Sequence, residues 1–292
     1  MQTSAASADG FGPTDSTRRW VQTDTGASLS VIERPGDPGL PAFLLVHGLA
    51  SNARLWDGVG TRLAAMGHAS VAVDQRGHGR SDPADGRFDF ATLVDDLAGV
   101  VAATLARPVV AVGQSWGGNV VLEMAVRRHR MVQALALIDG GFLTLSEAFP
   151  DWEEAQRLLA PPDLTSLTAA ALEAEMRARL DGWPEEGIRG QLANFEILPN
   201  GKVRPHLDRP NHMKILRHLW EHRPDEIAAA VRCPVLVLAI GDGAPDKTNR
   251  VAAFAGRLPD GEVRWATGHH DIHAQMPDLV AEHLIDLAEV ST

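Results

Sequence analysis

The chain has 292 residues, of which 45% are hydrophobic and 22% are charged, and its net charge is −11. This length and composition fit one large α/β domain, or a core domain with a sizeable insertion. The acidic balance argues against a nucleic-acid or anionic-membrane partner, because both need clustered lysine and arginine. The single cysteine, Cys233, excludes an internal disulfide, and the lack of tyrosine removes any phenol from the chemistry.

The first residues do not resemble a targeting signal. Residues 1–17 are small and polar, without the basic and apolar regions of a signal peptide, and we expect a disordered leader. No apolar run approaches the length of a membrane span. We therefore expect a cytoplasmic protein that has no membrane partner.

Strand-like apolar runs alternate with helix-like runs along most of the chain. The predicted strands are 19–23, 28–33, 42–46, 69–74, 109–112, 132–138, 234–240 and 262–266. The predicted helices are 56–66, 89–105, 120–128, 248–258 and 279–290. This alternation predicts an α/β fold with a doubly wound, mostly parallel sheet, whose first two strands form a hairpin.

The alternation stops between residues 143 and 224. This stretch has a helical pattern interrupted by prolines, and a turn at 199–202 suggests a small hairpin. We predict a cap over the carboxyl ends of the strands, with 18–142 and 225–292 as the core. The alternative is a pair of helices in the outer layer. The side chains that the cap offers as pocket walls or polar contacts are Trp152, Trp183, Phe195, Met213, Trp220, His212 and Lys214.

The most informative stretch is Gly-x-Ser-x-Gly at residues 113–117, between an apolar strand and a helix. A serine at the tip of such a turn has a strained backbone, and its hydroxyl projects above the sheet. The backbone N–H of Trp116, at the start of the helix, faces the same space and can stabilise negative charge. The plain alternative is a glycine-rich turn that carries an ordinary serine.

A serine hydroxyl becomes a good nucleophile when a base removes its proton, and histidine is the usual base near neutral pH. The histidines predicted at carboxyl ends of strands are His47, His78, His269, His270 and His273. The last three, together with Asp271, are alternatively potential metal ligands. Nothing else in the chain completes a zinc or iron pattern, so no metal is predicted.

Four motifs in this order resemble the α/β-hydrolase fold superfamily. They are His47-Gly48-Leu49, the run Asp-Gln-Arg-Gly-His-Gly-Arg-Ser at 74–81, the Ser115 turn, and a histidine loop before the last helix. The resemblance covers roughly residues 19–140 and 232–290. It implies that Ser115 is the nucleophile, that the N–H groups of Leu49 and Trp116 form the oxyanion hole, and that no cofactor is needed.

The resemblance also selects the base. In the family, the proline that opens the last helix follows the histidine by seven residues, and Pro277 stands in that relation to His270. His270 is therefore preferred over His269, and His273 is expected to line the pocket. Three further motif residues are expected to hold loops in place: His47, His78 and Arg76.

The carboxylate that orients the histidine has three candidates. In most of the family it lies three residues after a glycine that follows the strand before last. Counted from the first such glycine this position is Ala244, and counted from the second it is Asp246, while Asp242 lies two residues short of the first count. Some haloalkane dehalogenases instead use the end of the strand after the nucleophile helix, where this chain has Asp139. We prefer Asp139 as the residue that holds the tautomer of His270.

These residues predict a serine hydrolase that cleaves a small or medium, largely apolar ester or lactone through an acyl-enzyme. In the resembling family, haloalkane dehalogenases and epoxide hydrolases use an aspartate nucleophile, which argues against both. C–C bond hydrolysis and cofactor-free, haloperoxidase-like perhydrolysis are alternatives on the same triad. A ligand-binding receptor with little turnover is the alternative from another class, because fold alone does not decide function.

Overall fold

The computed structural model describes residues 16–83, 85–142, 144–164, 166–241 and 243–291. Most of the predicted leader lies outside these residues, and Thr17 at its end already begins the first strand. None of the described helices is both long and apolar enough to cross a lipid bilayer.

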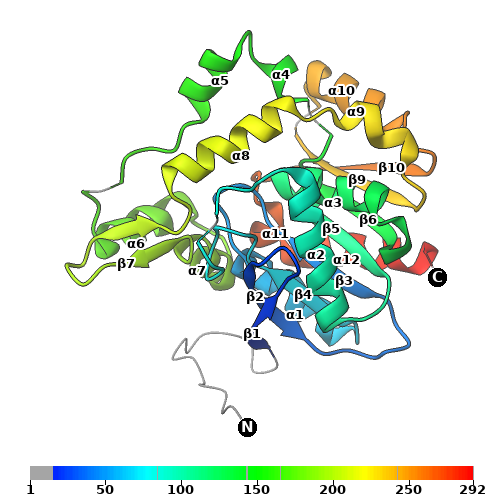
Figure 1. The fold of residues 1–292 in the computed structure, drawn as a ribbon, viewed down its shortest axis with the longest axis horizontal. Coiled ribbons are helices and arrows are strands. Elements are labelled where there is room, and N and C mark those ends of the chain that lie inside the picture. Colours follow the sequence, from blue (N-terminus) through cyan, green and yellow to red (C-terminus); the bar gives the residue numbers. More distant parts are fainter. Residues whose placement is uncertain (1–15, 84, 143, 165, 242, 292) are drawn as a thin grey trace.

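An eight-stranded sheet forms the centre of the molecule (Figure 1). Its strands are β1 (Thr17–Gln22), β2 (Ser28–Arg34), β3 (Ala42–Val46), β4 (Ser70–Val73), β5 (Val109–Gln114), β6 (Val132–Ile138), β9 (Val235–Ile240) and β10 (Gly261–Ala266). The order across the sheet is β1-β2-β4-β3-β5-β6-β9-β10. β2 pairs antiparallel with β1 and β4, and the other neighbours pair parallel. The predicted hairpin and mostly parallel sheet are confirmed.

Helices cover both faces of this sheet. They are α1 (Asp57–Ala65), α2 (Phe90–Thr104), α3 (Trp116–Arg127), α9 (Pro224–Ile227), α10 (Pro245–Ala255), α11 (Ile272–Gln275) and α12 (Pro277–Val290), with single turns η1 (Ala53–Trp56), η2 (His129–Met131) and η3 (Ala228–Ala230). In β5, Val109 and Ala111 pack into the core on the α2–α3 face, and Val110 and Val112 into the core on the α1–α12 face. Burial on both faces explains why this strand is apolar at successive positions.

The chain between β6 and β9 makes a long excursion, which we call the insertion (residues 144–223). It contains α4 (Leu145–Ala148), α5 (Trp152–Leu159), α6 (Ala169–Arg179), α7 (Glu185–Leu192), β7 (Phe195–Ile197), β8 (Val203–Pro205) and α8 (Arg209–Glu221). β7 and β8 pair antiparallel around the predicted turn at 199–202. The boundaries between core and cap stay a prediction.

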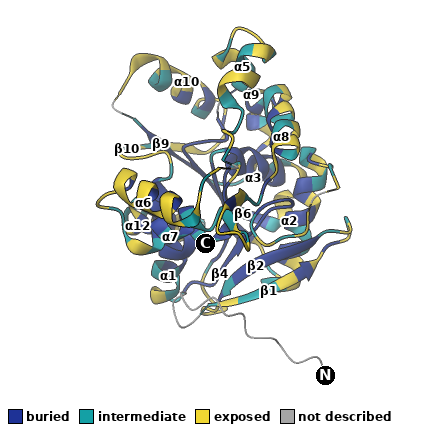
Figure 2. Ribbon diagram, turned by 90° about the vertical axis from the view of Figure 1, so that its left-hand side faces the viewer, coloured by how far each residue is buried: buried dark blue, intermediate teal, exposed yellow. Residues whose placement is uncertain are grey.

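Part of the insertion has an apolar cluster of its own. Leu172, Met176 and Leu180 of the α6 region pack there with Ile188 and Val203. α7 also packs against η1, α1 and α11, and thereby joins the insertion to the core. Figure 2 shows α5 and α6 with largely exposed outer faces and the central strands buried. Because α7 faces both parts, the residues on it are well placed to line space between them.

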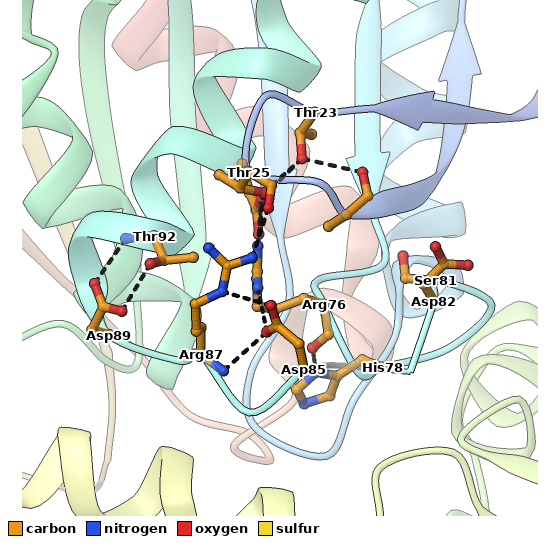
Figure 3. A network of polar contacts seen from close by, with 12 residues as sticks. Thr23, Thr25, Arg76, His78, Ser81, Asp82, Asp85, Arg87, Asp89 and Thr92 are labelled. Atoms are coloured by element: carbon orange, nitrogen blue, oxygen red, sulfur yellow. Dashed lines mark hydrogen bonds and ion pairs between the residues drawn. The ribbon is translucent and has the colours of Figure 1, made fainter.

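The loop after β4 is held by a buried ion pair. Arg76 Nε donates to Asp96 Oδ2 at 2.6 Å, and Arg76 Nη2 donates to Asp96 Oδ1 at 2.9 Å. Figure 3 shows the Arg76 guanidinium also pointing toward Thr25 and Asp85, which accept at 2.8 and 3.2 Å. Arg76 therefore fixes this loop against α2 and the β1–β2 hairpin, as expected from the sequence.

Candidate active site

Ser115 lies between the end of β5 and the start of α3. Its backbone has φ 53° and ψ −125°, a conformation that costs energy for a residue with a side chain. The Ser115 N–H donates to Ile138 O at 3.0 Å, which ties the turn to the end of β6. This strained strand-to-helix turn is the geometry of a nucleophile elbow, in which the hydroxyl stands above the carboxyl edge of the sheet.

Two glycines allow neighbouring loops to close in on this turn. A Cβ at Gly117 would lie 2.5 Å from His47 O, and a Cβ at Gly140 would lie 2.2 Å from Ser115 O. Both distances are far below contact, so neither position accepts a side chain without backbone movement. The loops after β3 and β6 therefore pack directly on the elbow.

His270 and Asp139 form a short polar contact near the elbow. His270 Nδ1 donates to Asp139 Oδ2 at 2.6 Å. With the proton on Nδ1, the other ring nitrogen, Nε2, is left as the acceptor. Asp139 follows β6 directly, has φ 43°, which aspartate tolerates better than most residues, and is 8% exposed.

The second oxygen of Asp139 is also occupied. Asp139 Oδ1 accepts a hydrogen bond from Lys247 Nζ at 2.7 Å and from the Ile240 N–H at 3.2 Å. Lys247 lies on α10, so the carboxylate is held by groups from β9, α10 and the histidine loop. Sequence reasoning missed Lys247, because nothing in the sequence relates it to a residue 108 positions away.

The loop that carries His270 is anchored on both sides. The His270 carbonyl accepts from Gln114 Nε2 at 3.0 Å, which links it to the end of β5. Asp271 Oδ2 accepts from Gln191 Nε2 of α7 at 2.7 Å. The insertion thus contacts the residue next to His270. Gln191 is a further residue that sequence reasoning did not single out.

Burial and charge act in opposite directions on this pair. Burial lowers the pKa of His270, but the hydrogen bond from its ring to Asp139 and the Asp139 charge raise it, and the net pKa lies above 6.5. Burial raises the pKa of Asp139, yet its bonds to His270 and Lys247 hold the pKa below 3.8. Asp139 is therefore ionised at neutral pH and stabilises a protonated imidazole.

The other two acid candidates do not make this contact. Asp246 is exposed in the first turn of α10. Asp242 lies outside the described residues. Among the carboxylates that the structure describes, Asp139 is the one whose oxygen hydrogen-bonds the His270 ring.

The expectation that His273 lines the pocket is wrong. His273 is fully buried on α11, and its ring packs against Trp56 with 4.3 Å between the centroids. It turns into the core because α11 covers the α1 face of the sheet. Burial lowers the pKa of His273 to about 4, so the ring is neutral at physiological pH.

The four potential metal ligands of this loop point to different partners. His269 packs edge-on against Trp183 at 5.0 Å, His270 binds Asp139, Asp271 accepts from Gln191, and His273 is buried. Across the described part of the chain, no three histidine, cysteine, aspartate or glutamate side chains are grouped closely enough to hold a metal ion.

His47 and His78 hold loops in place, as expected. His47 Nε2 accepts from the Gln75 N–H at 3.0 Å, and its Nδ1 donates to Gly48 O at 2.7 Å. His78 Nε2 accepts from the Ala50 N–H at 3.2 Å. Both rings therefore fix the loop after β3.

That loop brings Leu49 to the elbow. A Cβ on Gly48, the residue before Leu49, would lie 3.0 Å from the Ser115 Cβ, so the loop passes in contact with the serine. Trp116 begins α3, where backbone N–H groups lack partners within the helix. Within the described residues, the N–H groups of Leu49 and Trp116 donate to no protein acceptor.

A cavity of about 320 Å³ lies between the insertion and this loop. Its wall includes Ala50, next to Leu49, and Gln191, which donates to the residue next to His270. Most of the wall is apolar, as in Leu167, Leu172, Met176 and Leu207. The cavity therefore lies next to the loop after β3, and its lining does not include Ser115, Asp139 or His270.

Only some of the predicted cap walls line this cavity. Phe195 and His212 line this cavity. Trp152 and Trp220 instead pack edge-on against each other at 5.8 Å, so they stabilise the insertion. Neither Met213 nor Lys214 lines this cavity. The spacing along a helix alone did not distinguish wall residues from packing residues.

A family model described as the alpha/beta hydrolase fold matches residues 41–274. The chain belongs to this family. The match includes the loop after β3, the elbow, Asp139 and the histidine loop. Family membership therefore rests on the same segments that converge in space, and it includes the insertion between them.

Two curated relatives and one crystal structure are similar to this α/β-hydrolase chain. An uncharacterized protein of Mycobacterium tuberculosis is 30% identical over 129 residues, which is 42% of this chain and 38% of that protein. A 2-(acetamidomethylene)succinate hydrolase of Mesorhizobium japonicum is 28% identical over 165 residues, 56% of this chain and 58% of that protein. The matches thus span less than two thirds of either relative. The crystal structure of E-2-(acetamidomethylene)succinate hydrolase superposes with a TM-score of 0.75 at 24% identity, over 94% of this chain and 99% of that one.

Proposed function

We propose that this protein is a serine hydrolase that cleaves a small or medium, largely apolar ester or lactone. The observation that carries the proposal is the 2.6 Å hydrogen bond between His270 Nδ1 and the ionised Asp139, made beside a serine in a strained elbow. A base oriented by a buried carboxylate is what a serine nucleophile needs.

In the proposed reaction, the Ser115 hydroxyl attacks the carbonyl carbon, and His270 Nε2 takes the hydroxyl proton. The carbonyl oxygen becomes an oxyanion, which accepts hydrogen bonds from the N–H groups of Leu49 and Trp116. The tetrahedral intermediate collapses, and His270 gives its proton to the leaving alkoxide. An ester between Ser115 and the acyl group remains.

Water completes the cycle. His270 removes a proton from a water molecule, which attacks the acyl carbon and forms a second tetrahedral intermediate. Its collapse returns the proton to Ser115 Oγ and releases the carboxylic acid. Asp139 stays ionised through both halves and stabilises the imidazolium that forms in each.

The proposed substrate class follows from the walls of the site. We assign the insertion the role of the cap, with the 320 Å³ cavity holding the apolar part of the substrate. Leu167, Leu172 and Met176 suit an apolar group, while the charged side chains of Glu175 and Arg179 also line the cavity. The Mesorhizobium relative is named for hydrolysis of a substituted succinate, which supports a hydrolase here without indicating the same substrate.

A substrate panel tests this function. p-Nitrophenyl esters from acetate to octanoate, several lactones and a β-diketone are assayed side by side with the wild type and Ser115→Ala. We expect ester or lactone turnover that disappears in Ser115→Ala. Turnover that survives this substitution would exclude the serine mechanism. Preferential cleavage of the β-diketone would favour C–C hydrolysis, and tight binding without turnover would favour the receptor.

A further inference from the structure

The polar side chains that line the 320 Å³ cavity differ in how deeply they are buried. Glu175 and Arg179 line it from α6 but are exposed, so water solvates their charges. Gln191 and His212 line it from α7 and α8 and are only 8% and 7% exposed. A polar group that is buried needs a hydrogen-bond partner in place of the water it has lost. The partners of Gln191 and His212 therefore indicate what the cavity offers to a ligand.

The contact that His212 makes fixes which of its ring nitrogens carries the proton. Nε2 lies 3.2 Å from the carbonyl oxygen of Leu159, at the end of α5, and a carbonyl oxygen can only accept, so Nε2 donates. Burial lowers the pKa of His212 and the bond to Leu159 raises it, and the net pKa lies below 6.5. The ring is therefore neutral at neutral pH, and Nδ1 is an acceptor. Among the residues that the structure describes, no donor reaches this Nδ1.

The amide of Gln191 is oriented by its partner in the same way. Its Nε2 donates to Asp271 Oδ2 at 2.7 Å, so its other end, Oε1, is an acceptor. Within the described part of the chain, no N–H or O–H group donates to this Oε1. Neither Gln191 Oε1 nor His212 Nδ1 is sealed off from solvent. Two buried side chains thus present acceptors to one cavity, and the protein supplies a donor to neither.

The rest of the wall is largely apolar, with Leu167, Leu172 and Met176 among its residues. A purely apolar ligand would displace water from the two acceptors and leave both unpaired, which costs free energy. A ligand with an O–H or N–H group at the same place would restore the lost hydrogen bond. The cavity is therefore better matched to an apolar chain that carries a donor than to a plain hydrocarbon chain.

We propose that the substrate carries an uncharged hydrogen-bond donor, a hydroxyl or an amide N–H, on an otherwise apolar chain, and that His212 Nδ1 and Gln191 Oε1 accept from it. This inference rests on the proposed function, in which the cavity holds the apolar part of the substrate. His212 and Gln191 then determine specificity and take no part in the chemistry. Gln191 also donates to the residue next to His270, so the recognition of the donor is joined to the loop that carries the base.

Isothermal titration calorimetry tests the proposal with ligands that cannot be hydrolysed. 8-Hydroxyoctan-2-one and 10-hydroxydecan-2-one carry a ketone in place of the ester and a hydroxyl at the end of the chain. Their methyl ethers keep the oxygen and lose the donor, and the added methyl group by itself favours burial in an apolar cavity. A third pair, 8-acetamidooctan-2-one and its N-methyl derivative, tests the amide N–H. We expect the donor-bearing member of at least one pair to bind with a Kd about tenfold lower than its partner, and that pair identifies the donor.

Variants of His212 locate the preference. His212→Phe keeps a ring of similar size and removes Nδ1, and we expect the two Kd values of the pair to become about equal. His212→Asn can place its side-chain oxygen near the position of Nδ1, so it should keep part of the preference. His218→Phe, on the same helix but outside the cavity lining, is the matched control and should keep the wild-type ratio. Thermal unfolding checks that each variant folds.

The proposal is overturned if no donor-bearing ligand binds more tightly than its partner, or if the preference survives in folded His212→Phe. Because the ketones are not hydrolysed, these outcomes do not depend on turnover. Ester or lactone turnover that survives Ser115→Ala would instead overturn the proposed function.

Discussion

Lys247 and Asp139 form an ion pair in which Nζ lies 2.7 Å from Oδ1, the carboxylate oxygen that His270 does not use. Lys247 Nζ also donates to the Ile240 carbonyl, so the ammonium group is fixed at the end of β9. The carboxylate is consequently held from two directions. The orientation of the Asp139 carboxylate toward His270 therefore depends on Lys247, which is not a member of the proposed triad.

Replacing Lys247 by methionine should lower kcat and change its pH dependence. The Lys247 charge lowers the pKa of His270, so its removal raises that pKa and moves the acidic limb of the kcat/KM profile to higher pH. Loss of the anchor should lower kcat by about 10- to 100-fold through misorientation. Lys247→Arg is the control that keeps the charge. A methionine variant with a wild-type pH profile would show that Lys247 is only structural.

Asp139→Asn should lower kcat by roughly 10³- to 10⁴-fold, because an amide supports the wrong imidazole tautomer. Asp246→Asn is the matched control, since Asp246 is exposed on α10, and it should retain near wild-type kcat. Steady-state hydrolysis of a p-nitrophenyl ester measures both. The reverse pattern, with the loss in Asp246→Asn, would move the triad acid to that residue.

The pH profile of the wild type should report a His270 pKa above 6.5. Burial lowers this pKa and the bond and charge of Asp139 raise it by more, so His270 becomes protonated, and inactive as a base, while the pH is still above 6.5. kcat/KM should fall as the pH is lowered through that value. In Asp139→Asn the raising effect is lost, and the limb should move to lower pH. If the acidic limb of the kcat/KM profile does not move in Asp139→Asn, the limb reports the pKa of a group other than His270.

His273 should make the stability of the protein depend on pH. Its folded pKa is about 4, whereas the unfolded value is about 6.5, so below pH 6.5 the unfolded chain binds a proton that the folded chain excludes. Stability is therefore full above pH 6.5 and falls by about 3 kcal/mol toward pH 4. Urea unfolding of His273→Phe should lack this component, and His269→Phe, with a half-exposed ring, should keep it. If the free energy of unfolding depends on pH equally in both variants, the assignment of this dependence to His273 is wrong.

Arg76→Leu should destabilise the protein by about 3–5 kcal/mol, because it leaves Asp96 as a buried, unpaired charge. The two side chains are 2% and 3% exposed. Replacing both by leucine should restore most of the loss, since the uncompensated charge is gone. Urea unfolding of Arg76→Leu, of Asp96→Leu and of the double variant measures these changes in stability. A loss below about 1 kcal/mol, typical of an exposed pair, would show that water reaches Asp96.

The central strands of the sheet were largely predictable because they are buried on both faces. β3 and β6 begin and end where their apolar runs do. Helix starts were less predictable. α3 begins at Trp116 rather than at residue 120, because the elbow requires the helix to start at once even though two glycines follow. α10 begins at Pro245 rather than at residue 248, since proline is well suited to a first helical turn.

The candidate site was predictable where local motifs specify it and not where it depends on contacts between distant segments. Ser115 and His270 stand in motifs with a fixed relation to a strand or a helix. His273 was misjudged, because a four-residue helix has no periodicity that indicates its buried face. Lys247 contacts Asp139 from 108 residues away in the chain, and no pattern in the sequence expresses that contact.

The claim that Ser115 is a nucleophile activated by His270 is tested most directly by covalent labelling. The protein is treated with a fluorophosphonate, and the adduct is quantified by intact mass and located by peptide mass spectrometry. We predict one adduct per chain, on Ser115, with no labelling in Ser115→Ala and much slower labelling in His270→Ala. An adduct on another residue, no adduct on the folded protein, or equal labelling rates with and without His270 would contradict the account.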